Sequence, residues 1–492
     1  MLMYLKALMT QCRALYNALA LSGARIHRLR PPPPGAGGRL PEPIFRLRAP
    51  PPPPHAPLPL NRLSVSPRRP DNARPASGRN YTPHWDSAFI TAAARLHPAG
   101  SAGWTPTAGD FVKFGFTMAS TTTLLAWGLL SYKEAYKSAG QLQYAVDAVK
   151  WATDYFIKCH VAPTELYGQV GDFDLDHKYW GRPEELNMSR PAFKIDAQHP
   201  GSDLAGETAA ALAAASLVFR GDKPEYADLC LRHARELYHF ANQHRGLYHE
   251  SIRGAEPYYE STDYGDELTW AAAWLYKATN ESQFLDEAEH HYMKFRLKER
   301  PNEFFYNKKV AGVQVLMAQL TKQKEYVEAA QAFCDFTVDH QKRTPKGLVY
   351  IDKFGTLCHA ANVAFVCLQA SEAGLGGRKY VDFARRQINY MLGDSGRSFV
   401  VGYGDNPPKQ PYHAASSCPD LPAPCDWEAF RSKEPNPQVL YGALVSGPDE
   451  NDFFEDKREE YVYTEVTLDY NAGFQSAVAG LLQDELRSLK VQ

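Results

Sequence analysis

Apolar residues recur at helical spacing along most of the chain from about residue 115 onward. In the segment 142–160 one set of apolar residues shares one helical face and a second set shares another: Leu142, Val146, Val149 and Phe156, then Tyr144, Ala148, Trp151 and Tyr155. A helix with apolar residues on most sides is expected to be buried, so this segment predicts a layered helical body.

Twelve segments have this helical pattern: residues 4–23, 115–135, 142–160, 205–220, 224–243, 266–279, 282–295, 309–321, 324–340, 358–373, 378–392 and 471–487. Most come in consecutive pairs joined by short loops, which predicts an all-α fold of helical hairpins. The segment 205–220 is rich in small residues, so it is expected to pack closely against its neighbours, with Ser202 and Asp203 as candidate caps.

Four stretches between these pairs are too long to be simple connections: residues 161–201, 245–265, 341–357 and 393–470. They are rich in aromatic and polar residues. Because loops of this length in a compact domain are usually functional, we expect the chemistry to lie there.

Residues 25–83 differ from the rest of the chain because they are proline-rich, basic and poor in periodic apolar residues. They predict a disordered or polyproline II linker, with a proline-rich recognition ligand as the alternative. The apolar N-terminus ahead of them is interrupted by Lys6, Gln11 and Arg13, which does not fit the continuous core of a signal peptide.

Composition narrows the class of partner. The 54 basic and 56 acidic residues nearly cancel, so no net field favours nucleic acid or an anionic membrane, and no stretch approaches a transmembrane span. Aromatic residues make up 12% of the chain, which suits surfaces that stack against sugars.

The eight cysteines have no metal-ligand spacing, which argues against zinc. Cys418 and Cys425 bracket a short proline-rich loop and could close a disulfide, while Cys230, Cys334 and Cys367 lie in apolar helical segments and are interpreted as buried thiols. This usage permits secretion.

Acidic residues that precede apolar helices are the candidates for chemistry. Asp110 lies in a Gly-Asp turn, where an aspartate most often caps a turn, and Asp469 or Asn471 could cap the last helix. Glu465 differs because aromatic and apolar neighbours surround it. Such surroundings raise the pKa of a carboxyl group, as a general acid requires.

A family resemblance rests on seven signature residues in 454–472 and on the segments "WATDYFIK", "YGQVGDFDLDHKYWGRPEE", "PGSDLAGETAAALAAASLVF", "TPKGLVYID" and "DYNAGFQSA". By these features, residues 102–487 are similar to glycoside hydrolase family 9, and in particular to its invertebrate endoglucanases. The resemblance implies an (α/α)6 barrel with a cleft formed by loops, an endo-β-1,4-glucanase acting on cellulose or another β-1,4-glucan, and a secreted, monomeric enzyme. It makes 1–24 the first barrel helix, 25–83 an insertion and 84–492 the catalytic domain.

The resemblance also implies roles for single residues. Asp110 matches the base that activates the hydrolytic water, Glu465 matches the proton donor, and Asp456 matches a signature aspartate expected to orient the loop around Glu465. Two carboxyl groups in these roles invert the anomeric carbon and lie roughly 6.5–9.5 Å apart. The residues expected to line the glucan cleft are His177, Trp180, Tyr306, Phe354 and His413.

The chain departs from the family at Thr107, Tyr412 and Ala414, which replace an aspartate, a histidine and an arginine. These changes favour, as an alternative, a catalytically impaired β-glucan-binding protein; a lyase or mannosidase with the same fold would lack the signature.

No cofactor is required by this mechanism. Structural calcium is one interpretation of four hard oxygen donors, with helix caps and surface charge as the other: Asp203, Glu207, Asp263 and Asp266.

Overall fold

A computed structural model describes residues 109–491. The predicted helix over 4–23, the proline-rich segment 25–83 and Thr107 lie outside the described residues.

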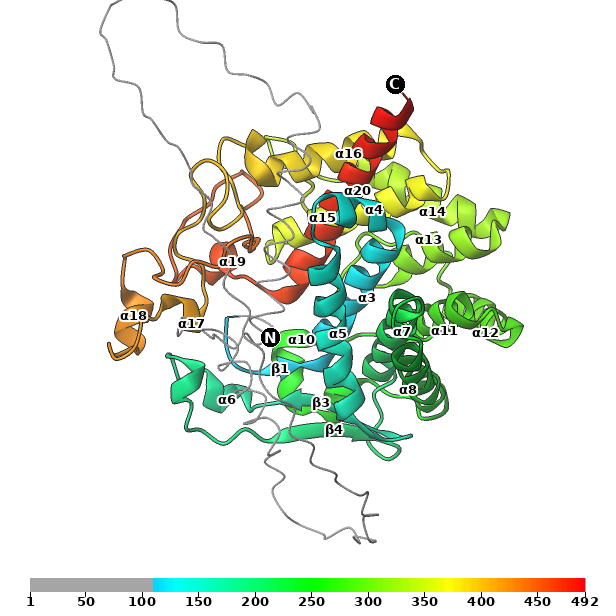
Figure 1. Ribbon diagram of the computed structural model, residues 1–492, viewed down its shortest axis with the longest axis horizontal. Helices are drawn as coiled ribbons and strands as arrows, with labels where there is room; N and C mark the ends of the chain where they lie inside the picture. The colour runs from blue at the N-terminus through cyan, green and yellow to red at the C-terminus, as the bar shows by residue number, and fades with distance from the viewer. Residues whose placement is uncertain (1–108, 492) are drawn as a thin grey trace, which may run out of the picture. The chain divides into compact units, whose positions relative to one another are not determined.

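Six helices form an inner ring and are buried over most of their length: α3 (Gly115–Ser131), α7 (Ser202–Phe219), α11 (Gly265–Thr279), α13 (Val310–Thr321), α15 (Thr356–Glu372) and α20 (Leu468–Val491). Each packs against the next, and α20 packs against α3, so the ring is closed (Figure 1). These helices have apolar residues on every side because an inner helix is surrounded by protein.

Small residues let the inner helices approach closely. The Ala-rich α7 is almost wholly buried, and a Cβ atom added at Gly206 would lie 3.2 Å from the backbone oxygen of Glu267 in α11. The predicted close packing of this segment is therefore confirmed.

Five outer helices cover this ring and bury one face each: α5 (Leu142–Cys159), α8 (Pro224–Gln243), α12 (Ser282–Lys294), α14 (Lys324–Asp339) and α16 (Arg378–Asn389). Together with the six inner helices they supply eleven helices of the predicted (α/α)6 barrel, and the twelfth predicted helix, residues 4–23, lies outside the described residues. The expectation for 142–160 was partly wrong, because α5 lies in the outer layer and its Tyr144 is half exposed.

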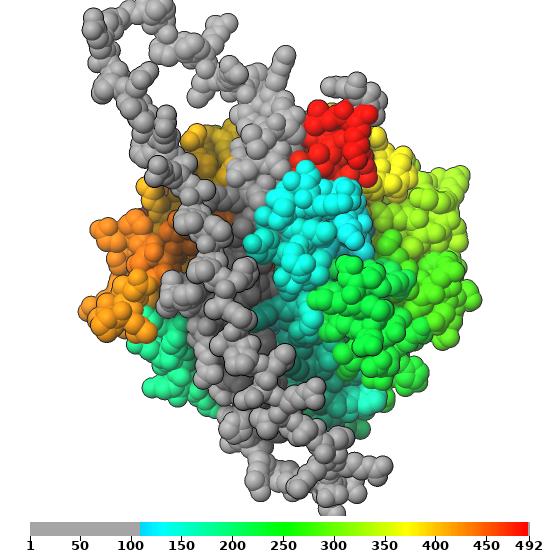
Figure 2. All heavy atoms as spheres, in the orientation of Figure 1, coloured from blue at the N-terminus to red at the C-terminus, as the bar shows by residue number. Residues whose placement is uncertain are grey.

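The two ends of the described chain meet in the barrel. The short helix α4 (Lys133–Ser138), which follows α3, contacts α20. In the space-filling view the red C-terminal helix lies against the cyan N-terminal helices, as closure of the ring requires (Figure 2).

The stretch 161–201, expected to be a loop, contains most of a small antiparallel sheet. Its strands are β1 (Lys113–Phe114), β2 (His160–Ala162), β3 (Glu165–Val170) and β4 (Ala192–Asp196). β3 pairs with the other three, and Phe114 faces Gln169 while His160 faces Leu166. The sheet anchors the chain immediately after Asp110.

Short helices lie in or beside three of the long stretches, 161–201, 245–265 and 393–470. They are α6 (Phe173–Asp176), η1 (Pro183–Glu185), α9 (Tyr248–Ser251), η2 (Arg253–Ala255), α10 (Glu256–Tyr259), η3 (Tyr390–Asp394), α17 (Ala414–Ser417), α18 (Trp427–Arg431) and α19 (Tyr461–Thr464).

Aromatic rings fill the middle of the barrel. Trp127 makes edge-to-face contacts with Trp270, Trp274 and Phe365, with ring centroids 5.4 to 6.0 Å apart. Such pairs add about 0.5–1.5 kcal/mol each beyond the area they bury. Among the helices of 109–491, none is both long and apolar enough to cross a membrane.

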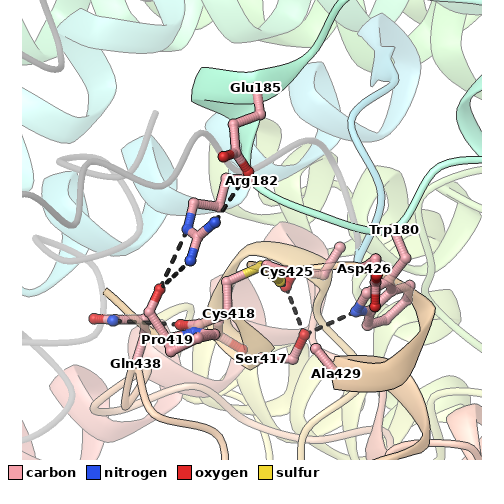
Figure 3. The surroundings of a disulfide bond; sticks show 12 residues. Trp180, Arg182, Glu185, Ser417, Cys418, Pro419, Cys425, Asp426, Ala429 and Gln438 are labelled. Carbon is pink, nitrogen blue, oxygen red and sulfur yellow. Dashed lines mark hydrogen bonds and ion pairs between the residues drawn. A yellow bond between two sulfur atoms is a disulfide. The ribbon is translucent and has the colours of Figure 1, made fainter. Parts of the chain in front are cut away.

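Cys418 and Cys425 form a disulfide with Cα atoms 5.3 Å apart, and Cys230, Cys334 and Cys367 are buried free thiols, so these predictions are confirmed. Figure 3 shows how the disulfide loop is attached to the chain after α6: the Trp180 indole N–H donates to Ser417 Oγ at 2.8 Å, and Arg182 donates to the Pro419 carbonyl. These contacts join the stretches 161–201 and 393–470 at one end of the barrel.

Candidate active site

A cleft of about 750 Å³ lies where several inner helices begin. Asp110 precedes α3, Lys308 precedes α13, Phe354 precedes α15 and Glu465 precedes α20, and all four line it. Helix N-termini carry partial positive charge, so this end of the barrel suits carboxylates. The lining residues are Asp110, Phe173, His177, Pro257, Tyr258, Tyr259, Glu303, Phe305, Tyr306, Asn307, Lys308, Asp352, Phe354, His359, Tyr412, Tyr461, Glu465, Thr467, Asp469 and Tyr470.

Glu465 is held by its own backbone at the end of α19. Its N–H donates to the Tyr461 carbonyl at 3.0 Å, and its carbonyl accepts from Ser446 N–H at 2.8 Å. Burial, and after it the nearby charge of Asp469, raise the pKa of the Glu465 carboxyl to about 8, while a hydrogen bond with Tyr470 acts in the opposite direction. At neutral pH the group keeps its proton, as the sequence predicted.

Asp469 lies in the first turn of α20 and lines the same cleft. The Thr467 hydroxyl donates to Asp469 Oδ1 at 2.6 Å, and the Tyr470 backbone N–H donates to Thr467 Oγ1 at 3.1 Å. Thr467, rather than Asp469 or Asn471, therefore accepts the hydrogen bond at the start of the last helix. Burial raises the pKa of Asp469 to about 6, so near neutral pH it is the charge that acts on Glu465.

Asp110 makes the turn contact that its sequence context indicated and also lies in the cleft. The Val112 backbone N–H donates to Asp110 Oδ1 at 2.9 Å. Burial raises the pKa of Asp110 well above its usual range, with further contributions from the charges of Asp176 and Glu465. A carboxylate with a raised pKa binds a proton more strongly, which strengthens it as a base once it is ionised.

Asp176 and Arg190 hold the residue after Asp110. The Phe111 backbone N–H donates to Asp176 Oδ1 at 3.1 Å, and Arg190 Nη2 donates to the Phe111 carbonyl at 2.7 Å. The sequence reasoning did not single out either residue. The acidic run around Asp176, inside a quoted family motif, was the available signal, but nothing local connects it with residue 111.

Asp456 is not among the residues that line the cleft. Its two carboxylate oxygens accept the backbone N–H groups of Lys409 and Gln410 at 2.9 and 3.1 Å. These bonds join the segment that leads to Glu465 to the segment that leads to Tyr412, and the orienting role expected for Asp456 stays a prediction.

Three of the five predicted glucan contacts line the cleft: His177, Tyr306 and Phe354. Phe354 is 42% exposed, and its ring lies nearly parallel to that of Tyr461 with centroids 6.3 Å apart. The sequence reasoning missed Tyr258 and Tyr259, which the cleft gains from α10. Their signal was the tyrosine pair inside a long loop.

Trp180 and His413 are corrections, because both are buried and neither lines the cleft. Trp180 packs in an apolar cluster with Phe111 and donates to Ser417. His413 Nδ1 accepts the Ser416 backbone N–H at 3.1 Å and caps α17. Both residues support the wall of the cleft from behind.

The two described departures from the family pattern have different surroundings. Tyr412 lines the cleft and its backbone N–H donates to the Thr464 carbonyl at 3.0 Å, next to Glu465. Ala414 is buried in the cluster with Phe111 and Trp180. The small side chain of alanine fits this buried position behind the cleft wall.

The four candidate calcium ligands have protein partners. Asp203 accepts the Tyr248 backbone N–H, Asp263 accepts backbone N–H groups where α11 begins, and Asp266 accepts the N–H of Lys309. The Lys309 ammonium lies 3.6 Å from Glu207. No three of these carboxylates converge on a common point in 109–491, so the geometry lends calcium no support here.

Known proteins are similar to this chain over most of its length. Residues 84–478 match the model of glycosyl hydrolase family 9. Endoglucanase B of Cellulomonas fimi is 43% identical over 400 residues, which cover 78% of this chain and 38% of that protein. Endoglucanase A of Bacillus pumilus is 40% identical over 77% of this chain and 59% of its own length, so the chain spans only part of these curated relatives.

The structure of an endoglucanase from the termite Nasutitermes takasagoensis is 56% identical, with a TM-score of 0.77, over 77% of this chain and 88% of that one. This similarity confirms the expected resemblance to invertebrate members. The family match covers the described barrel together with Asp110, Glu465 and the aromatic residues of the cleft, and the chain belongs to glycosyl hydrolase family 9.

Proposed function

We propose that this protein is an endo-β-1,4-glucanase that hydrolyses internal bonds of cellulose or a related β-1,4-glucan with inversion. The observation that carries the proposal is the pair Glu465 and Asp110, two carboxyl groups in one cleft of which the first keeps its proton at neutral pH. A related endoglucanase, CelQ from Clostridium thermocellum, has been solved with cellotriose and is 33% identical, with a TM-score of 0.70, over 78% of this chain and 64% of that one.

In this mechanism Glu465 donates its proton to the leaving glycosidic oxygen. Asp110 accepts a proton from the water that attacks the anomeric carbon from the opposite side of the sugar ring. The C–O bond to the leaving group breaks as the new C–O bond forms, so the product has the inverted configuration. The two residues supply both proton transfers, and the proposed reaction needs no cofactor.

The aromatic lining supports a sugar chain as the substrate. Tyr258, Phe354 and Tyr461 are each more than 40% exposed, which is unusual for large side chains inside a cleft unless a ligand covers them. Pyranose rings offer apolar faces to such rings, while Glu303, Asn307 and Asp352 supply partners for hydroxyl groups.

The central experiment measures release of reducing ends from carboxymethyl cellulose by the purified protein and by the double variant Asp110→Asn, Glu465→Gln. We expect release by the wild type only. If the wild type releases no more than the double variant yet still binds the glucan, the protein is the impaired β-glucan-binding protein, and Tyr412 becomes the first position to examine.

The single variant Glu465→Gln separates binding from chemistry. The amide keeps the shape of the side chain but has no acidic proton to donate, so hydrolysis should be lost while glucan binding, measured by calorimetry, persists. Wild-type turnover of an unactivated glucan by this variant would refute the assignment of Glu465.

We further propose that the protein acts outside the cell as a monomer. The Cys418–Cys425 disulfide supports this location, since disulfides persist in oxidising compartments. Size-exclusion chromatography with light scattering, and recovery of the protein from culture medium, test the two statements.

A further inference from the structure

The structure places two histidines and a glutamate together at a point away from the glucan cleft. His160 begins β2 directly after α5, while His233 and Glu236 lie three residues apart on α8. One potential ligand atom from each lies within 4.8 Å of the others, and this is the one such group of three among residues 109–491.

The two imidazoles are paired through their Nδ1 atoms, which are 2.7 Å apart. A neutral imidazole has one N–H and one lone pair, so one ring must donate the single proton between them to the other. A metal ion could replace that proton and bind both lone pairs. Glu236 would then supply a third, anionic donor, and water the fourth position.

The backbone fixes this arrangement from two elements. The His160 backbone N–H donates to the Phe156 carbonyl, where α5 ends. His160 also pairs with Leu166 of β3 in the sheet. On α8, residues three apart share a face, so His233 and Glu236 point the same way. The three donors are therefore presented by rigid segments, not by a mobile loop.

We propose that His160, His233 and Glu236 form a binding site for a zinc ion that links the end of α5 to α8. Imidazole nitrogen with one carboxylate suits zinc and excludes the hard cations calcium and magnesium, which prefer oxygen ligands. Tetrahedral zinc holds its ligand atoms roughly 3.3 Å apart, so the nitrogen pair must open by only about half an ångström.

Burial supports a stable site with an entry path. His160 is 5% exposed, His233 is half-buried and Glu236 is exposed, so an ion can enter from the side of Glu236. None of the three lines the cleft. The ion would act on stability rather than on hydrolysis, because it binds the folded chain and cross-links two outer helices.

The test uses tag-free protein that has been treated with EDTA and dialysed, then titrated with zinc chloride in a calorimeter. We expect one zinc per chain, a melting temperature that rises by a few degrees with excess zinc, and affinity weakened at least about tenfold by Glu236→Gln and by His233→Gln. His239→Gln is the matched control, because His239 is an exposed histidine on the same helix.

Two further measurements identify the ligands. Cobalt bound by nitrogen and oxygen lacks the charge-transfer absorption of a cobalt thiolate, so its spectrum excludes capture by the neighbouring Cys159. The His233→Gln variant should hydrolyse glucan as fast as the wild type. No binding at tens of micromolar zinc, or equal affinity in the wild type and both site variants, would overturn the proposal.

Discussion

Asp176 and Arg190 approach each other to 4.0 Å, between Oδ2 and Nη1, and hold opposite sides of one residue, Phe111. The carboxylate accepts its N–H and the guanidinium donates to its carbonyl. Because Asp110 directly precedes Phe111, Asp176 and Arg190 position the proposed base. They do so from 65 and 79 positions beyond Phe111 in the sequence.

Asp176→Ala should lower turnover about 10- to 100-fold with little change in KM, since it releases the peptide next to the base while leaving the sugar contacts in place. Asp176→Asn keeps an oxygen that can accept the Phe111 N–H and should restore most of the turnover. Steady-state kinetics with a glucan of defined length distinguish the two variants. Equal losses in both would contradict a positioning role.

Asp110→Asn separates the turn from the chemistry. Asparagine can still accept the Val112 N–H and caps about as well as aspartate, so the melting temperature should not change. Loss of the proton acceptor should reduce turnover at least about 10²-fold. Thermal unfolding and kinetics on the same preparation check both statements, and near-normal turnover would leave Asp110 with a structural role only.

The pH dependence of turnover should be bell-shaped. Glu465 must be protonated, so activity falls as pH rises through its pKa of about 8, and Asp110 must be ionised, so activity falls toward acid. Asp469→Asn removes the negative charge that raises the pKa of Glu465, and the alkaline limb should therefore move to lower pH. An unmoved alkaline limb would show that another group sets it.

The same shift has a consequence for stability. The pKa of Glu465 is raised in the folded chain, so the folded state binds the proton more tightly than the unfolded one, and stability falls as pH rises from the ordinary glutamate range to about 8. Glu465→Gln should thus unfold at a higher temperature than the wild type above pH 8. Calorimetry of both proteins at pH 5 and pH 9 tests this, because the variant should gain more in melting temperature at pH 9. A larger gain in melting temperature at pH 5 would contradict the prediction.

Deletion of 25–83 tests the domain organisation expected from the sequence. A segment so rich in proline buries little apolar area, so the melting temperature should stay nearly unchanged. A large drop would show that the segment packs on the catalytic domain.

Local pattern was sufficient for the helices. The eleven predicted helices that fall within 109–491 are present, because helical periodicity and small-residue composition are properties of neighbouring positions. Glu465 could be recognised for a similar reason: Tyr470, one of the aromatic residues close to it in the sequence, contacts its carboxyl group in the structure.

Tertiary structure decided what lies in the cleft and what lies behind it. Trp180 and His413 have the residue types of sugar contacts, but both are buried. Trp180 packs with Phe111 and donates to Ser417, and both partners are far from it in the sequence. Likewise, Asp176 and Arg190 become partners of residue 111 only when the sheet brings β1, β3 and β4 together. Helical periodicity is determined over a few neighbouring residues. Packing between distant segments, by contrast, decides whether an aromatic ring faces into the cleft or away from it, and which backbone N–H a carboxylate accepts.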